Sequence, residues 1–328
     1  MDIIKTFKER AKKNPKRIVF PESRDERILR AVEELAEEEI LIPVLVGDKE
    51  KIYQAAKDLK INLDKIEIQE PKKSENLERY ALSYTKKRDV EKGVALQLMG
   101  KNLLFGAMMV KEDDAEGIVA GAANSTATII HVALTTIGLA PGISLLSSFF
   151  VMFFPASSER EEKILIYADG GVNIEPDAQQ LADIAVASGR SAKQLLGIEP
   201  RIAMLSFSTK GSAEHPVVDK VIQATRLAKE KDPSLFIDGE FQGDTALVPR
   251  VAKKKLKEIG DVAGRANVLI FPDLNSGNIC YKLTQYLAHA KAFGPILQGL
   301  AKPISDLSRG ASKDDIVDIA SIVAVEAI

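Results

Sequence analysis

The residues of this sequence best suited to chemistry lie close together in one late segment, Ser308 to Asp315. The segment carries a hydroxyl at Ser308, a guanidinium at Arg309 and a carboxylate at Asp315, and Gly310 permits a bend between them. A guanidinium presents five N–H donors in one plane, which suits a phosphate or a carbonyl oxygen that gains negative charge. The segment therefore predicts an anion site with a proton acceptor nearby.

Asp315 has two interpretations. Ser312-x-x-Asp315 is a capping-box pattern, and a helix that begins at Ser312 places apolar residues at helical spacing: Ile316, Ile319, Ala320 and Val323. In the first interpretation the carboxylate only satisfies a backbone donor at the start of this helix. In the second it is a general base held near the guanidinium. The local pattern does not choose between them.

Composition limits the class of protein. At 328 residues the chain exceeds the usual size of a single core, so we expect two domains. A net charge of −2 gives no reason to expect a nucleic-acid or membrane partner. Cys280 is the only cysteine, which excludes an intrachain disulfide, and the most apolar run, 143–154, predicts a buried strand rather than a membrane span. We expect a cytoplasmic enzyme.

The first 60 residues alternate between strand and helix patterns. Apolar runs at 17–21 and 41–47 predict strands, and helices are expected at 26–38 and 49–59. This alternation is typical of an α/β fold with a parallel sheet covered by helices. In such sheets ligands bind beyond the carboxyl ends of the strands, where Arg27 stands, although a solvated surface arginine explains that residue as well.

Three further segments share a strand, a polar turn and a helix: 117–128, 201–213 and 267–278. In the first, small residues lead to Ser125 and Thr126, whose hydroxyls and following backbone N–H groups could face an anion or merely cap the helix. Together these turns predict a cleft that holds anions. Arg88 ends a basic run that could contact an anionic ligand tail or lie in solvent.

Several motifs of other enzyme classes are missing from the sequence. We find neither the G-x-G-x-x-G fingerprint of dinucleotide-binding proteins nor the P-loop of nucleoside triphosphatases. The three histidines are scattered, and no cysteine and histidine group has the spacing of metal ligands. No metal site is therefore predicted.

Longer motifs resemble those of the phosphate acetyltransferase (phosphotransacetylase) family. The resemblance covers essentially the whole chain, is densest from residue 200 onward, and is carried by Phe20 to Arg27, Met204 to Ala213, Asp238 to Gln242, Ala266 to Leu274, Gly277 to Ile279 and Gly294 to Gly310. It implies an acyltransferase that interconverts acetyl-CoA plus phosphate with acetyl phosphate plus coenzyme A. Coenzyme A is then a substrate, and no cofactor or metal is expected.

The resemblance also implies an architecture. Such enzymes are similar to the isocitrate and isopropylmalate dehydrogenases, with two α/β domains of mostly parallel sheets flanked by helices, a site in the cleft between the domains, and a homodimeric assembly. On that basis the first domain comprises residues 1–147 plus 306–328, and the second comprises 148–305.

Particular residues match the family's functional positions. Ser308, Arg309 and Asp315 match its catalytic residues: Asp315 takes the proton of the coenzyme A thiol, and the thiolate attacks the acyl carbonyl directly. Arg309 binds the phosphate and stabilises charge on the carbonyl oxygen, while Ser308 helps to position it. Arg27 matches an arginine that contacts coenzyme A, and Arg88 matches another across a one-residue gap.

One position departs from the family pattern. The family usually carries His-Ser-Thr-Ala-Asp-Thr-Leu-Arg-Pro where this chain has Asn124 to Val132, so His131 stands in place of an arginine of the coenzyme A site. An imidazole cannot replace a bidentate guanidinium on phosphate. The alternatives are weaker binding of coenzyme A, a preference for propanoyl or butanoyl groups, a catalytically impaired homologue that binds coenzyme A or acyl phosphate, or a His131 that is simply a surface residue.

Overall fold

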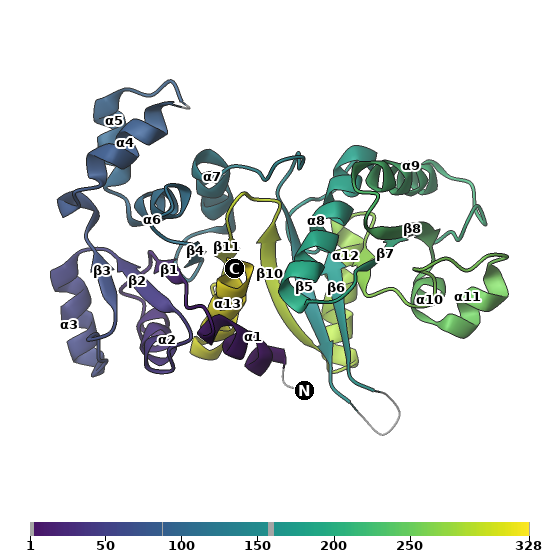
Figure 1. Ribbon diagram of the computed structural model, residues 1–328, viewed down its shortest axis with the longest axis horizontal. Coiled ribbons are helices and arrows are strands. Elements are labelled where there is room, and N and C mark those ends of the chain that lie inside the picture. The colour runs from purple at the N-terminus through teal and green to yellow at the C-terminus, as the bar shows by residue number, and fades with distance from the viewer. Residues whose placement is uncertain (1–2, 87, 157–160, 328) are drawn as a thin grey trace. The chain divides into compact units, whose positions relative to one another are not determined.

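The structure is a computed structural model that describes residues 3–86, 88–156 and 161–327. The chain divides into two compact units. The first comprises Met1–Ala140 and Leu300–Ile328, and the second comprises Pro141–Gly299. The colour bar of Figure 1 gives the residue numbers by which each can be found. Compactness alone does not make a unit a domain, which must also be able to fold by itself. The predicted domain boundaries at 147/148 and 305/306 therefore stay a prediction.

The first unit is built on five parallel strands. Their order is β3-β2-β1-β4-β11, and each neighbouring pair runs parallel. Because the strands are parallel, the loops that follow them all leave from one edge of the sheet. The strands are β1 (Arg17–Phe20), β2 (Ile42–Val46), β3 (Glu67–Gln69), β4 (Gly117–Ala120) and β11 (Ile304–Asp306).

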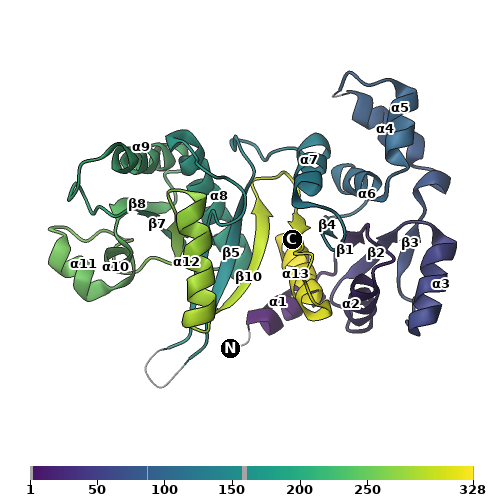
Figure 2. The same ribbon diagram turned by 180° about the vertical axis from the view of Figure 1, so that it is seen from behind.

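Helices cover both faces of these strands. Figures 1 and 2 place α6 (Asn102–Lys111) and α7 (Thr126–Thr136) on one side, and α2 (Glu26–Glu37) and α13 (Lys313–Glu326) on the other. The remaining helices of this unit are α1 (Ile3–Lys12), α3 (Lys49–Leu59), the short 3₁₀ helix η1 (Pro71–Lys73), α4 (Leu77–Lys86) and α5 (Lys92–Met99). In the described ranges no single helix has the length and apolar composition to cross a membrane, and α5 and α6 pass that test only as a pair bent by 102°.

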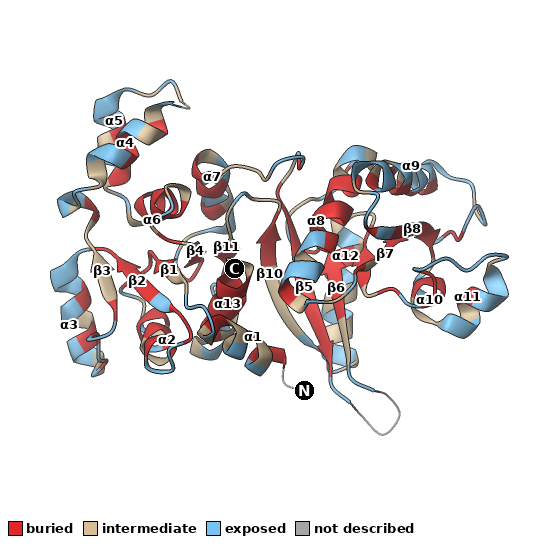
Figure 3. Cartoon of the chain, viewed as in Figure 1, coloured by how far each residue is buried: buried red, intermediate tan, exposed pale blue. Residues whose placement is uncertain are grey.

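Apolar spacing explains how the helices pack. Helix α2 buries one stripe of side chains, Ile28, Leu29, Val32 and Leu35, and keeps its charged face outside. Helix α13 is buried along most of its length, from Ile316 to Val325, as Figure 3 shows, and it packs against α1 and α2. Burial of α13 on several sides fixes the start of the helix, and the loop that precedes it, to the first unit.

The second unit contains the strands β10-β5-β6-β9-β7-β8 in that order. Strand β5 pairs antiparallel with both neighbours, and the other pairs are parallel. The strands are β5 (Ser147–Phe154), β6 (Lys163–Ala168), β7 (Arg201–Leu205), β8 (Phe236–Phe241), β9 (Val268–Ile270) and β10 (Lys291–Gln298). The helices are α8 (Ala178–Leu196), α9 (Pro216–Lys231), α10 (Gly243–Leu247), α11 (Pro249–Lys255) and α12 (Leu274–Leu287). The predicted α/β class, with mostly parallel strands flanked by helices, is confirmed.

Candidate active site

The loop after β11 exposes the two residues with the strongest case for catalysis. Ser308 and Arg309 are both exposed, and within the described ranges no residue hydrogen-bonds or ion-pairs with the Arg309 guanidinium. The loop closes on itself, since the Ala311 N–H donates to the Ser308 carbonyl at 2.9 Å and the Gly310 N–H donates to Ser308 Oγ at 3.3 Å. The result is a rigid turn that carries an uncompensated cation.

Asp315 forms the predicted cap and keeps one carboxylate oxygen free, while its role as a general base stays a prediction. Its Oδ2 accepts from the Ser312 N–H and from Ser312 Oγ, each at 2.8 Å, and Ser312 Oγ in turn accepts from the Asp315 N–H at 3.2 Å. These contacts form a capping box at the start of α13, so the expected cap is present. Oδ1 of the same exposed side chain has no hydrogen-bond partner among the described residues, and can therefore still accept a proton.

Arg27 ties this loop to the rest of the first unit. Its Nη1 donates to the carbonyls of Arg309 at 2.7 Å and Ala311 at 2.9 Å. Its Nε and Nη2 donate to the two carboxylate oxygens of Asp25 at 3.0 and 2.7 Å, and Nη2 also reaches the Ala122 carbonyl at 3.1 Å. All five N–H donors of the guanidinium are thus used within the protein. The hydrogen bonds from Arg27 lower the pKa of Asp25. Contact between Arg27 and coenzyme A stays a prediction.

The small-residue turn after β4 is occupied by a carboxylate of the protein itself. Glu22 is 9% exposed, and its Oε2 accepts from the N–H groups of Gly121 at 3.0 Å and Ala122 at 2.7 Å. Its Oε1 accepts from those of Ala123 at 2.8 Å and Asn124 at 2.6 Å. These four donors are therefore not open to a ligand, contrary to the expectation from the small residues. Sequence reasoning missed this role of Glu22, which follows a buried strand within the Phe20 to Arg27 motif.

The two hydroxyl residues at the start of α7 remain at the surface. Ser125 is the N-cap: its Oγ accepts from the Thr128 N–H at 3.2 Å. Thr126 is exposed, and its hydroxyl offsets part of the rise in the pKa of the Asp306 carboxyl. Capping of α7 is thus confirmed for Ser125, while contact of either hydroxyl with substrate stays a prediction.

Asp306 is a second carboxylate that the sequence reasoning did not single out. It ends β11, is 5% exposed, and its Oδ1 is buried without a hydrogen-bond partner. Burial raises the pKa of this carboxyl, and the nearby Glu22 raises it further. The side chain also blocks space beside Gly121, where a Cβ atom would lie 2.6 Å from Asp306 Oδ1. The Asp306 carboxyl therefore keeps its proton to a higher pH than an ordinary aspartate does.

The comparable turns of the second unit are also filled from within. Ser208 Oγ and the Gly211 N–H donate to Glu240 Oε1 at 2.9 and 2.7 Å. Asp273 caps α12, accepting from the Ser276 N–H at 2.8 Å. Polar turns after these strands therefore bind internal carboxylates, which explains their composition without any ligand.

His131 and Arg88 lie around one pocket of the first unit. The pocket has a volume of about 490 Å³ and His131 contributes to its wall. Arg88 Nε donates to the Thr135 carbonyl at 3.2 Å, and its guanidinium lies 5.5 Å from the centre of the Tyr84 ring, so Arg88 contacts two lining residues. The lining residues are Pro21, Tyr84, Leu98, Lys101, Asn102, Leu103, Leu104, Asn124, Thr128, His131, Val132 and Thr135. Their mixed character suits an amphipathic ligand.

The geometry defines a class of site. Parallel strands end in a loop with an exposed guanidinium, a hydroxyl and a free carboxylate oxygen, as expected of an acyltransferase that handles an anionic substrate. Within the described part of the chain, no group of three or more histidine, cysteine, aspartate or glutamate side chains is placed to hold a metal ion.

Comparison with known proteins identifies the family. Residues 2–324 match the family model described as phosphate acetyl/butaryl transferase. The phosphate acetyltransferase of Thermoanaerobacterium thermosaccharolyticum is 49% identical over 332 residues, covering 100% of both chains, and that of Acetivibrio thermocellus is 47% identical over 331 residues, covering 100% of this chain and 98% of the other. The solved structure of EutD phosphotransacetylase from Staphylococcus aureus aligns with a TM-score of 0.93 at 38% identity, covering 100% of this chain and 98% of that one. The chain belongs to the phosphate acetyl/butaryl transferase family, and the resemblance inferred from its motifs is confirmed.

Proposed function

We propose that this chain is a phosphate acetyltransferase, which interconverts acetyl-CoA plus phosphate with acetyl phosphate plus coenzyme A. The names of its relatives support this activity. The observation that carries the proposed mechanism is the pairing, on one braced loop, of an unpartnered Arg309 guanidinium with an Asp315 carboxylate whose Oδ1 is free.

The first step is removal of a proton from the substrate. A thiol has an ordinary pKa near 8.5, so coenzyme A is mostly protonated at neutral pH and needs a base. Asp315 Oδ1 accepts that proton, while Oδ2 remains engaged by Ser312. The sulfur lone pair then forms a bond with the acyl carbon of acetyl phosphate. Phosphate leaves with the electron pair of the broken carbon–oxygen bond.

The Arg309 guanidinium stabilises the charge that this attack creates. Its planar donors can hold the phosphate and the carbonyl oxygen together, and such preorganised donors contribute most when nothing else neutralises them. Ser308 stands next to it and offers a hydroxyl donor from the same exposed turn. Because an acyl phosphate is already activated, the proposed reaction uses coenzyme A as a substrate and needs no further cofactor or metal.

An absorbance assay of thiol release or thioester consumption tests this proposal. Purified protein is given phosphate and a series of acyl-CoAs, and acetyl is expected to turn over fastest. Faster turnover of propanoyl or butanoyl would change the assigned substrate, and no turnover with any chain length would contradict the function. The cytoplasmic location and the homodimer inferred from the sequence stay predictions.

A pair of variants separates the two roles of Asp315. Asp315→Asn keeps an oxygen for the cap but removes the base, and we expect turnover to fall by about 10²- to 10⁴-fold. Ser312→Ala keeps the carboxylate but removes the cap hydroxyl, so it should cost about 1 kcal/mol of folding free energy and leave most activity. Equal losses of activity in the two variants would show that Asp315 acts only through the cap.

A further inference from the structure

Asp306 is a buried carboxyl at the base of the loop after β11, and the proposed mechanism gives it no role. It ends β11 opposite Ala120 of β4 and stands two residues before Ser308. The side chain is 5% exposed, and its Oδ1 is buried without a hydrogen-bond partner among the described residues. A buried acceptor without a donor costs free energy, and the cost is larger when the group is charged. This position is therefore unfavourable for an ionised side chain.

The backbone beside Asp306 fits closely against the turn after β4. The Leu307 N–H donates to the Ala120 carbonyl at 2.6 Å. Gly121 has a φ of +120°, and a Cβ atom there would collide with the backbone of Leu307 and lie 2.6 Å from Asp306 Oδ1. The turn and the loop thus have no space between them, and a displacement of Asp306 moves Leu307 and Ser308 with it.

The surroundings of Asp306 favour its uncharged form. Burial raises the pKa of the carboxyl, the Thr126 hydroxyl offsets part of the rise, and the nearby Glu22 carboxylate adds to it. The four backbone N–H groups of the turn Gly121–Asn124 cannot neutralise a second carboxylate, because Glu22 already accepts from all of them. Ionisation of Asp306 would therefore place two like charges at the base of the loop.

The other elements packed against β11 carry few charged groups near Asp306. Strand β4 has no titratable side chain, and α7 has only His131, which lines the pocket of about 490 Å³. Helix α13 carries Lys313, Asp314, Asp315, Asp318 and Glu326. At its start, Lys313 pairs with Asp314 at 2.8 Å and Asp315 forms the cap. Among the described residues, Glu22 is the charged group that shifts the pKa of Asp306.

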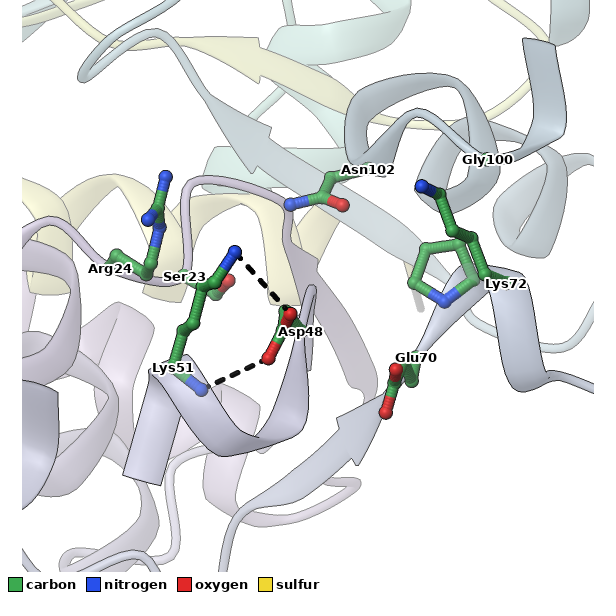
Figure 4. Close-up of a pocket in the computed structure, with 9 residues that line it drawn as sticks. Ser23, Arg24, Asp48, Lys51, Glu70, Lys72, Gly100 and Asn102 are labelled. Carbon is green, nitrogen blue, oxygen red and sulfur yellow. Dashed lines mark hydrogen bonds and ion pairs between the residues drawn. The ribbon is translucent and has the colours of Figure 1, made fainter. Parts of the chain in front are cut away.

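Asp48 is a carboxylate in the opposite situation. It caps α3 by accepting from the Lys51 N–H at 3.1 Å, and it pairs with Lys51 Nζ at 3.6 Å, as the dashed lines in Figure 4 show. These contacts lower the pKa of Asp48, the backbone hydrogen bond most of all. Asp48 is therefore charged over the range of pH in which Asp306 loses its proton, which makes it a matched control.

We propose that Asp306 is a positioning residue of acyl transfer, whose uncharged carboxyl keeps the loop after β11 against the turn after β4 and whose ionisation displaces that loop. The effect on turnover rests on the proposed function, whereas the movement of the loop does not. Asp306 acts through the positions of Ser308 and Arg309. Because a misplacement of about 1 Å in a catalytic group can cost about a hundredfold in rate, turnover should fall as the pH rises through the pKa of Asp306.

The first experiment compares kcat of the unaltered chain and of Asp306→Asn at a series of pH values. Asparagine has the shape of the uncharged carboxyl and cannot ionise, and the thiol of coenzyme A titrates equally in both reactions. We expect similar kcat at acidic pH, and a ratio of variant to unaltered chain that grows to about tenfold or more as the pH rises. For Asp48→Asn the ratio should not change with pH. A ratio that is independent of pH for Asp306→Asn, or a variant that is slow at every pH, would overturn the proposal.

Amide hydrogen exchange gives a second reading that requires neither turnover nor a variant. The Leu307 N–H is protected by the Ala120 carbonyl, so its protection relative to an unstructured peptide at the same pH should be lost as the pH rises, while amides of β1 keep theirs. In Asp306→Asn the protection of Leu307 should stay constant. This result supports the proposal even if no acyl transfer is found. Constant protection of Leu307 in the unaltered chain would overturn the proposal even if acetyl-CoA turns over normally.

Discussion

Two loops at one edge of the first unit differ in whether the protein supplies a counter-charge for them. The turn Gly121–Asn124 follows β4, and its four backbone donors are all taken by the buried Glu22 carboxylate. The loop that follows β11, the neighbouring strand, leaves the Arg309 guanidinium without a partner in the described part of the chain. An internal counter-charge makes the first loop a structural element, whereas its absence makes the second loop receptive to an anion.

The two loops are also connected. Arg27 donates to the Ala122 carbonyl in the first loop and to the Arg309 and Ala311 carbonyls in the second. The turn Gly121–Asn124 therefore supports the loop after β11, because the Arg27 guanidinium holds the backbone carbonyls of both at fixed positions. A rigid support is what a preorganised catalytic group requires.

The largest effect is expected from the open loop. Arg309→Ala should lower turnover by about a hundredfold or more, equivalent to roughly 3–4 kcal/mol of barrier, because a preorganised charge-stabilising donor is lost. The free energy of unfolding should hardly change, since the guanidinium is exposed and has no described partner. Steady-state kinetics and urea unfolding measure the two quantities.

The matched control for that variant is Arg250→Ala, which removes an exposed arginine of α11 in the second unit. It should leave both turnover and stability unchanged. If Arg309→Ala retained normal turnover, or if it unfolded the protein, the contrast between an open and a neutralised loop would be wrong.

In the turn Gly121–Asn124, which Glu22 binds, a substitution should lower stability rather than turnover. Glu22→Gln replaces one acceptor oxygen by an NH₂ group that faces backbone donors, and we expect the free energy of unfolding to fall by about 2–3 kcal/mol. Urea unfolding measures this loss, and Glu75→Gln, at an exposed position of the same unit, is the control. A variant as stable as the unaltered chain would mean that the Glu22 charge does not hold the turn.

The sequence could predict local features of these loops, but it could not predict the long-range ones. The capping box of Ser312 and Asp315 was predictable because its partners are three residues apart and follow a known pattern. The partnership of Glu22 with Gly121 spans 99 residues, and that of Arg27 with Arg309 spans 282. Nothing in the local composition distinguishes a turn that awaits a ligand from one that a distant carboxylate already fills.

The same limit applies to the fold. The α/β class and the buried strand Ser147–Phe154 could be predicted, because a run of apolar residues indicates a buried segment whatever its partners are. The parallel pairing of β11 with β4 joins segments far apart in the chain, so periodicity could not reveal it, and the family resemblance was needed to return the last helix to the first unit. The loop from Ser308 to Asp315 owes its position to that pairing.

The connection between the loops can be weakened without removing charge. Arg27→Lys keeps a cation, but an ammonium has three donors and cannot span Asp25, Ala122 and the Arg309 loop together. We expect kcat to fall roughly tenfold through misplacement of Arg309, with a smaller change in the KM for coenzyme A. Arg30→Lys, which alters a surface ion pair on the same helix, is the control. A raised KM with unchanged kcat would instead indicate direct contact of Arg27 with coenzyme A.

The smallest effect concerns Asp306, the buried carboxylate between the two loops. Its pKa is raised in the folded protein, mainly by burial, so the folded state retains a proton that the unfolded state releases near pH 3.8. Stability should therefore fall as the pH rises from that value through the raised pKa, and Asp306→Asn should abolish this contribution. Urea unfolding at a series of pH values tests this, because the asparagine variant should gain stability relative to the unaltered chain as the pH rises. A difference between the variant and the unaltered chain that does not change with pH would mean that Asp306 is ionised like a surface aspartate, and that the support beside the filled turn carries two negative charges rather than one.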